Sequence, residues 1–548
     1  MIFKMKEFLV DLVKKLTEQS SIVGTDGEIK IAHLIYDELS KLEYFKKHPG
    51  NLFLSDIKGD SLGRKNVIAV VKGEKQDIDD TLILIGHMDT VGVEDYGDLK
   101  EFAFCPAELK DKLKTKSLDE DVIEDMNSDD WLFGRGIFDM KAGIAVEIGL
   151  LKEITENIKD FKGNIVFLAL ADEEGNSKGV LSAVDDLLKL QEKYGFSYQA
   201  VIDTDYMAPK FTGDEKKYIY IGTVGKLLPC FYIYGRETHV GQAFEGLDAN
   251  LIASEILKEV DLSFELSDVV ENEASLPPIS LCMRDLKQEY SVQTVNEAYI
   301  YLNYSTHVST PDEVIDKLKN KAYKAFTNVI NKLNKEYKTY CEATGQPFKK
   351  LPFEPRVLTF EEMYKEVWEE TKGKIGEILK KKKQELLREN IDERLFSLEM
   401  VREVHKNWSY RMPVVIIYFS PPYYPHIYVK SEDERGRKLI TAITEAVKKA
   451  KSKYDYKFEV KKFYPYISDL SYFAIPDKRE AIDALTKNMP GYGEIYSLPF
   501  ESILKLNLPV ANIGPFGKDA HKFTERVNVR YSFEVLPELI EEVIKNLL

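Results

Sequence analysis

The sequence from residue 82 to residue 90 reads Leu-Ile-Leu-Ile-Gly-His-Met-Asp-Thr. A short unbroken apolar run of this kind predicts a strand that is buried on both faces, as in a parallel sheet. The run brings His87 to the end of the strand and Asp89 two residues later. This stretch therefore favours an α/β fold and places two metal-binding side chains at a strand end.

Four further stretches present metal-binding side chains. Four of the five positions follow strand-like apolar runs, and open α/β sheets carry their sites at the carboxyl ends of the strands. The order His, Asp, Glu-Glu, Asp, His therefore predicts one two-metal hydrolase site. The four stretches are Gly-Arg-Gly-Ile-Phe-Asp-Met-Lys (134–141), Val-Phe-Leu-Ala-Leu-Ala-Asp-Glu-Glu-Gly (166–175), Val-Ile-Asp-Thr-Asp (201–205) and Asn-Ile-Gly-Pro-Phe-Gly (512–517), which leads to Ala-His-Lys-Phe-Thr-Glu (520–525).

The side-chain types suit a pair of divalent ions. Two ions about 3.5–4 Å apart need a carboxylate that bridges them, together with imidazole and carboxylate ligands that leave room for a shared water. Asp139 suits the bridge. One ion would take His87 and Asp205, and the other would take Glu174 and His521.

Two more roles remain around these ligands. A metal-bound imidazole usually donates its second N–H to a carboxylate, and Asp89 fits that role because side chains two apart on an extended segment point to the same side. The water needs a base that is not a ligand. The adjacent Glu173 and Glu174 can divide the work, one as base and one as ligand. Asp203 and Asp205 also share a side, so either could approach a metal.

Each stretch has an ordinary structural interpretation when taken alone. A His-x-Asp is more often a turn, an acidic pair is usually a solvated face, and an Asp before a helix is commonly an N-cap. The ordinary interpretation of all five stretches needs several independent coincidences, so we favour the metal site.

These motifs resemble the co-catalytic zinc metallopeptidase family that includes acetylornithine deacetylase, succinyl-diaminopimelate desuccinylase, aminoacylase and glutamate carboxypeptidase. The resemblance implies the ligand set above, with Glu173 as general acid/base and Asp205 preferred over Asp203. It implies two divalent ions, with zinc expected and cobalt or manganese also compatible with the donors. It also implies a cis peptide bond at Asp139-Met140.

A second block resembles the beginning of the family's inserted lid domain. It contains Gly-Thr-Val-Gly-Lys (222–226), the strand 227–234, Gly-Arg-Glu-Thr-His-Val-Gly-Gln (235–242) and Glu-Gly-Leu-Asp-Ala-Asn (245–250). The resemblance implies a homodimer formed through the lid, in which His239 crosses to the partner's site and polarises the substrate carbonyl. Without these flanking residues, a loop-capping histidine would be the default interpretation.

The length of the chain and the motifs at 203–209 and 516–526 resemble a long arginine-utilisation subgroup of the family. One feature departs from the family, which often carries an Asp-x-Arg on the third lid strand to grip a substrate carboxylate. Here that stretch reads Tyr-Leu-Asn-Tyr-Ser (301–305). Carboxylate recognition then moves to another residue, such as Arg236 or Arg284, or the substrate is not a simple N-acyl amino acid. Asp469, in a Ser-Asp segment, could order the substrate end of the pocket.

The domain organisation follows from the motifs. We expect a zinc-peptidase-like catalytic domain with a mostly parallel central sheet (1–223 and 357–548) and an inserted α+β lid domain (224–356). The charged segment 359–405 has heptad-like apolar positions and predicts an inserted pair of helices. The Val-Val-Ile-Ile-Tyr-Phe run at 414–419 predicts a buried strand that returns the chain to the catalytic sheet.

Composition excludes several classes of function. The chain has 548 residues, 44% of them hydrophobic, without an uninterrupted apolar stretch of the length that crosses a membrane. A formal net charge of −16 argues against a nucleic-acid partner, because phosphate binding needs a clustered basic face. The four cysteines are widely spaced, and the N-terminal segment 1–16 reads as an amphipathic helix, so we expect a cytoplasmic protein with reduced thiols.

The sequence therefore predicts a metal-dependent hydrolase that cleaves a C–N amide or ureido bond in a small amino-acid derivative, such as an N-acyl amino acid or a citrulline-like molecule. An aminopeptidase or dipeptidase acting on short peptides is the enzymatic alternative. A catalytically silent protein that binds an amino acid or a partner is the alternative of another class. The presence of every ligand and of the Glu base argues against the silent protein.

Overall fold

The computed structural model describes residues 2–389 and 391–548. The chain folds into two compact units. Unit 1 contains residues 1–223, 427–475 and 499–548, and unit 2 contains residues 224–426 and 476–498. Within the described residues, no helix combines the length and the apolar character that a membrane crossing needs.

Unit 1 is built on a nine-stranded sheet. The strand order is β1-β2-β5-β3-β6-β17-β7-β15, and β16 also pairs with β7. The central strands β5, β3, β6 and β17 run parallel, while β1 and β2 form an antiparallel edge. A separate three-stranded sheet has the order β18-β19-β4. The strands of unit 1 are β1 (Leu52–Asp56), β2 (Lys65–Lys72), β3 (Asp80–His87), β4 (Trp131–Phe133), β5 (Asn164–Leu170), β6 (Ser197–Asp203), β7 (Lys217–Thr223), β15 (Ile427–Tyr428), β16 (Phe458–Lys461), β17 (Val510–Asn512), β18 (Gly517–Lys518) and β19 (Arg526–Asn528).

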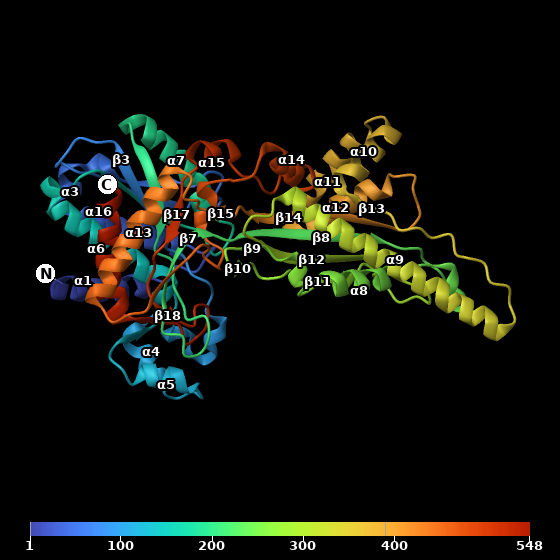
Figure 1. Cartoon of the computed structure of the whole chain (residues 1–548), viewed down its shortest axis with the longest axis horizontal. Helices are drawn as coiled ribbons and strands as arrows, with labels where there is room; N and C mark the ends of the chain where they lie inside the picture. Colours follow the sequence, from blue (N-terminus) through green and yellow to red (C-terminus); the bar gives the residue numbers. More distant parts are fainter. Residues whose placement is uncertain (1, 390) are drawn as a thin grey trace. The chain divides into compact units, whose positions relative to one another are not determined.

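Helices cover both faces of the large sheet. Every residue of β5 is buried, which requires a covering layer on each side of the strand. Helices α6, α13 and α16 pack side by side (Figure 1). Helices α2 and α7 contact the strands at the β1 end of the sheet. The fold is therefore the α/β class that the sequence predicts. The helices are α1 (Ile2–Glu18), α2 (Gly27–Ser40), α3 (Glu43–Lys47), α4 (Pro106–Leu113), α5 (Glu120–Met126), α6 (Ala142–Glu156), α7 (Lys178–Tyr194), α13 (Glu434–Lys453), α15 (Phe500–Leu506) and α16 (Leu536–Leu547).

Unit 2 is built on a five-stranded sheet with the order β11-β12-β8-β14-β13. Helix α8 and the long helix α9 pack on one another and contact the sheet strands (Figure 1). A capping box at Thr310 starts α9, and Gly345 in the left-handed region ends it. The elements are β8 (Gly225–Tyr234), α8 (Ala249–Val260), β9 (Val269–Val270), β10 (Glu273–Ala274), β11 (Ile279–Asp285), β12 (Glu297–Thr306), α9 (Pro311–Thr344), β13 (Val357–Thr359), α10 (Phe360–Thr371), α11 (Ile375–Glu389), α12 (Glu393–Lys406), β14 (Val414–Tyr424) and α14 (Arg479–Lys487).

The inserted segment contains three helices, α10, α11 and α12, where the sequence predicted a pair. Their apolar residues form a buried cluster with Cys230 and Tyr232 of β8 and with Ile416 of β14. The alternate residues Phe231 and Ile233 are also buried and point to the other face of the sheet. The inserted helices thus give this sheet a second covered face.

The prediction for β14 is wrong in one respect. This strand pairs antiparallel with β8, and therefore belongs to the five-stranded sheet and not to the large sheet of unit 1. The apolar run predicted a buried strand correctly. Burial on both faces does not specify which sheet supplies the neighbours, so the run alone could not select the partner strand.

Candidate metal centre

The parallel strand β3 presents His87 as its last residue. The ring Nε2 lies 3.0 Å from Asp139 Oδ1, and Nδ1 lies 3.1 Å from the backbone oxygen of Asp89. The Asp89 carboxylate is 3.7 Å from Nδ1 and also accepts hydrogen bonds from the backbone N–H groups of Glu173 and Glu174, at 3.2 and 3.0 Å. Asp89 therefore connects His87 to the turn that carries Glu173 and Glu174, the acidic turn.

Asp139 lies in an irregular turn, Ile137–Lys141, between β4 and α6. The Asp139-Met140 peptide bond is cis, as the resemblance predicted. Glu525, which is fully buried, accepts hydrogen bonds from the backbone N–H groups of Phe138 and Asp139 at 3.1 and 3.2 Å. Its other oxygen accepts from Arg135 at 2.7 Å. The carboxylate of a C-terminal segment thus fixes the turn that carries Asp139.

The turn of Glu173 and Glu174 follows β5 and begins at Asp172, a non-glycine residue with φ of +69°. Such a conformation persists only where neighbours hold it. The Asp172 carboxylate accepts from Arg64 Nη1 at 2.6 Å, and its backbone N–H donates to Glu28 at 3.0 Å. Arg64 is 3% exposed and Glu28 is fully buried. This buried ion network and Asp89 together hold the acidic turn.

Asp203 and Asp205 have different surroundings. The Asp203 carboxylate accepts from Ser468 Oγ at 2.8 Å and from the Asp205 N–H at 3.2 Å. Ligand atoms of Asp205, His87 and Asp139 all lie within 4.8 Å of one another. Asp205 is therefore better placed than Asp203 to share an ion with His87.

His521 completes a second group of donors. Its Nε2 lies 2.8 Å from Glu174 Oε1 and 3.1 Å from Asp139 Oδ2. The residue has a φ of +64° and sits in a turn that Asp519 holds through a hydrogen bond from Thr524 at 2.8 Å. The hydrogen bonds with Asp139 and Glu174 raise the pKa of His521 to about 10.

The donor set fits two divalent ions. One group consists of His87, Asp139 and Asp205, the other of Asp139, Glu174 and His521, and ligand atoms within each group lie within 4.8 Å of one another. Asp139 belongs to both groups, as a bridging carboxylate must. Burial raises the pKa values of Glu173 and Asp205 well above the usual range of carboxyls. Such a concentration of buried carboxylates needs compensating positive charge, which bound cations supply.

Of the remaining predicted residues, Asp469 lies near the metal centre, because the charges of His87, Asp89 and Asp203 act on its carboxyl. Asp469 is buried in unit 1, and burial raises its pKa well above the ordinary value. His239 belongs to unit 2, where its exposed ring accepts a hydrogen bond from the Gly241 N–H at 3.1 Å. Arg236 is exposed, and the guanidinium carbon of Arg284 lies 5.0 Å from the centroid of the Tyr299 ring.

Four residues that support the site were missed from the sequence: Arg64, Glu28, Arg135 and Glu525. Glu525 stands at the end of the motif 520–525, four residues after His521, and this spacing was its only signal. Arg64 and Glu28 are distant from the acidic turn in sequence, and charged residues are usually exposed, so nothing in the pattern marked them.

The chain belongs to the peptidase family M20/M25/M40, whose model matches residues 83–530. It is accordingly a metal-dependent hydrolase of the peptidase and amidohydrolase type. Protein RocB of Bacillus subtilis (strain 168) is 36% identical over 540 residues, which are 98% of this chain and 94% of that protein. The uncharacterized protein YqjN of the same strain is 35% identical over 552 residues, 100% of this chain and 98% of that protein.

Solved structures show the same fold at low sequence identity. A tripeptidase from Staphylococcus aureus subsp. aureus Mu50 aligns with a TM-score of 0.53 at 14% identity, covering 99% of this chain and 98% of that chain. Aminopeptidase PepT from Bacillus cereus ATCC 10987 aligns with a TM-score of 0.52 at 13% identity, with the same coverage of both chains. The metallopeptidase fold therefore extends over the length of the chain.

Proposed function

We propose that this protein cleaves a C–N amide or ureido bond of a small amino-acid derivative related to arginine, such as an N-acyl amino acid or a citrulline-like molecule. The observation that carries the proposal is the pair of donor groups that share Asp139, with Glu173 beside them. The similarity to RocB extends over nearly the whole chain. It supports the kind of substrate that the resemblance to the long arginine-utilisation subgroup implies, a compound related to arginine.

The roles follow from the side chains. His87, Asp139, Glu174, Asp205 and His521 would hold two divalent ions, and zinc suits this mixture of imidazole and carboxylate donors. Bound there, the ions supply a Lewis acid for the scissile carbonyl and lower the pKa of water.

Glu173 is the general acid/base. Its carboxylate takes a proton from the attacking water and later delivers it to the nitrogen of the leaving amine. The two backbone hydrogen bonds that Asp89 accepts fix the turn on which Glu173 stands. The site thus keeps the proton-transfer group and the metal-binding groups at a fixed spacing.

A panel of substrates tests this proposal. Metal-loaded protein is incubated with N-acyl amino acids, citrulline and dipeptides, and released amines are identified by mass spectrometry. We expect turnover of the acyl or ureido compounds and a loss of about 10²–10⁴-fold in Glu173→Gln, because general acid–base catalysis contributes this much. Release of two amino acids from dipeptides alone would instead identify a dipeptidase, and silence on every compound would contradict the proposal.

We also propose a homodimer formed through unit 2, with His239 acting in the partner's site. In the described sheet β11 pairs with β12 alone, so its second edge is open to another chain. Leu281 and Met283 on this strand are 53% and 38% exposed, which leaves apolar surface for a partner to cover.

Mixing two inactive variants tests this arrangement. His239→Ala and Glu173→Gln are unfolded and refolded together, so that half of the dimers contain one chain of each. A histidine that acts across the dimer restores one of two sites in such mixed dimers, about a quarter of wild-type activity in total. Activity that stays at the level of the separate variants, or a monomer in light scattering, would contradict the arrangement.

A further inference from the structure

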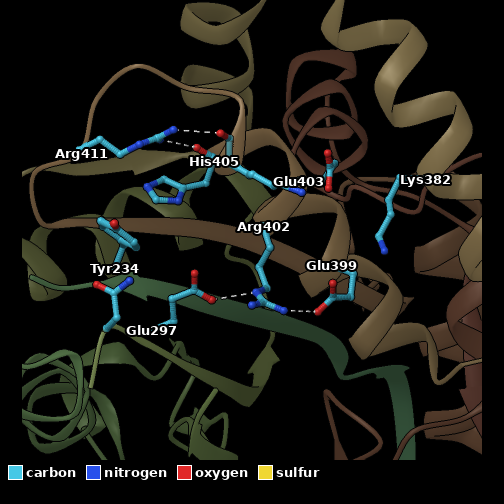
Figure 2. A pocket seen from close by; sticks show the side chains of 10 residues that line it. Tyr234, Glu297, Lys382, Glu399, Arg402, Glu403, His405 and Arg411 are labelled. Atoms are coloured by element: carbon cyan, nitrogen blue, oxygen red, sulfur yellow. Dashed lines mark hydrogen bonds and ion pairs between the residues drawn. The ribbon is translucent and has the colours of Figure 1, made fainter. Parts of the chain in front are cut away.

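Unit 2 contains a polar cavity of about 390 Å³ under the last turns of α12. Figure 2 shows side chains from the inserted helices and from the ends of β8 and β12 around it. Ligand sites in proteins have volumes of about 300–1,000 Å³, so the cavity is of a size for a small metabolite. Every lining side chain has a polar or charged group: Tyr234, Asn296, Glu297, Lys382, Glu399, Arg402, Glu403, His405, Lys406 and Arg411.

Three of these charged groups satisfy one another. Arg402 Nε donates to Glu297 at 2.8 Å, and its Nη1 donates to Glu399 at 2.7 Å (Figure 2). This clamp ties α12 to the first residue of β12 and fixes one wall of the cavity. The single guanidinium thus holds both carboxylates of the clamp and offsets one of their two negative charges before any ligand enters.

His405 forms a buried part of the lining. It is 4% exposed, its Nδ1 lies 3.2 Å from the Tyr232 hydroxyl, and its ring centroid is 4.2 Å from that of Tyr234. Within the described part of the chain, its Nε2 has no hydrogen-bond partner. Burial, with the nearby Arg411, lowers the pKa of His405 to about 4, so the imidazole is neutral at neutral pH. A buried nitrogen without a partner costs free energy, and this cost is removed when a ligand group or water bonds to it.

Two opposite charges of the lining, both on α12, also lack an ionic partner. Glu403 and Lys406 are three residues apart on α12, a spacing at which opposite charges usually pair. Among the described residues neither forms an ion pair within 4.0 Å, and Glu403 Oε1 accepts only from Asn407 Nδ2, at 3.1 Å. Arg411 donates to the carbonyl oxygens of His405 and Lys406 and so keeps the end of α12 in place (Figure 2).

We propose that this cavity binds a small zwitterion of the α-amino acid class, with its carboxylate on Lys406 and its ammonium group on Glu403. A lining that offers a cation, an anion and a neutral imidazole matches a ligand that carries both charges, whereas a simple anion would leave Glu403 unpaired. The lining is mainly polar and charged, which disfavours an apolar ligand. The site lies apart from the metal centre in sequence and does not depend on the proposed reaction.

The ligand would contact the two strand ends that hold the loop of His239. Tyr234 is the last residue of β8, and the next residue, Gly235, donates its N–H to the Asn296 oxygen at 2.7 Å. Farther along, the Thr294 N–H donates to the Thr238 oxygen at 2.9 Å. An occupant of the cavity would therefore restrict the base of this loop, and binding is expected to slow amide exchange at 233–240.

Titration calorimetry of the metal-loaded, full-length protein tests the proposal. The probes are glycine, L-arginine, L-ornithine, L-citrulline and L-glutamate, together with an N-acetyl amino acid and an amino-acid amide that each lack one charge. We expect saturable binding of at least one amino acid, and weaker binding of both blocked compounds. Glu403→Gln and Lys406→Gln should each lower the affinity about tenfold or more, since each removes a charge-assisted bond. Lys380→Gln is the control, because Lys380 is an exposed lysine on α11 outside the cavity.

Several outcomes would overturn the proposal. Absence of saturable binding by all five amino acids would do so, and so would blocked compounds that bind as tightly as the free ones. Binding that survives both cavity variants but disappears in Asp205→Asn would place the amino acid at the metal centre instead. If the variants fold poorly, hydrogen exchange of the wild-type protein decides the question, because the proposal requires ligand-dependent protection in α12 and at 233–240.

Discussion

Replacement of Arg64 by methionine should damage both the stability of unit 1 and the catalytic turn. Arg64 is 3% exposed and donates to three carboxylates, Asp60 at 2.7 Å, Glu28 at 3.0 Å and Asp172 at 2.6 Å. Methionine keeps the length of the side chain but leaves these acids without a cation. Removal of one member of a buried ion pair costs about 3–5 kcal/mol, and we expect a loss of that size.

The effect on catalysis should exceed what instability explains. Asp172 keeps its strained backbone because Arg64 and Glu28 hold it, and Glu173 and Glu174 follow directly. A displacement of about 1 Å at a catalytic group costs about 10²-fold in rate, so kcat should fall by this order in the folded protein. Arg64→Lys retains the charge without the forked geometry of the guanidinium. This variant should lower the free energy of unfolding by about 1–3 kcal/mol.

Hydrogen exchange of the amides in β3 and β5 measures the stability of unit 1, and steady-state kinetics with metal analysis measures the site. Arg437→Met, at an exposed position of α13, is the control and should change stability by less than about 0.5 kcal/mol. If Arg64→Met matches this control, the network does not stabilise the fold. If it is destabilised but keeps kcat and metal content, the network does not position the acidic turn.

Three further predictions concern other parts of the chain. In unit 2, burial would raise the pKa of Asp268, but hydrogen bonds from Ser309 Oγ and three backbone N–H groups lower it to about 2, below the usual 3.8. Asp268→Asn should therefore lose about 2 kcal/mol of stability at pH 7, and the difference should shrink as pH falls from about 4 to 2; a difference that grows in acid would contradict this. A Cβ at Gly143 would lie 2.2 Å from the Thr204 oxygen, so Gly143→Ala should shift α6, cost about 1–3 kcal/mol and weaken metal binding, as thermal denaturation and metal titration will show. Removal of metal by a chelator should abolish turnover and lower the melting temperature, with both restored by zinc; an unchanged melting temperature would mean that the ions do not stabilise the folded state.

Much of the site could be predicted from the sequence, because candidate metal-binding side chains and apolar strand patterns occur together in short stretches. The apolar run before His87 predicted both the buried strand β3 and the placement of the histidine at its end. The spacing of Asp203 and Asp205 left two candidates from the residues alone. Their surroundings in the structure differ, because the Asp203 carboxylate accepts hydrogen bonds from Ser468 and the Asp205 N–H, whereas Asp205 belongs to a donor group with His87 and Asp139.

The residues that hold the site in place could not be predicted from the sequence in this way. Glu28 and Arg64 reach Asp172 from more than a hundred residues away, and Glu525 reaches Asp139 across 386 residues. Hydrophobic periodicity reports whether a residue is buried but carries no information about which distant charge lies beside it. For the same reason, the sequence did not predict that β14 belongs to the five-stranded sheet.

The sequence by itself determined the α/β class, the order of the candidate metal-binding residues and the family, because local apolar runs and the residues that end them encode each of these. Only the tertiary structure decided which strands are neighbours, which buried ions hold the turns of Asp139 and Glu173, and how the inserted helices line a polar cavity. These features arise from contacts between segments that are far apart in the chain. A side chain in one such segment acts on its partner only after folding has brought the two segments together.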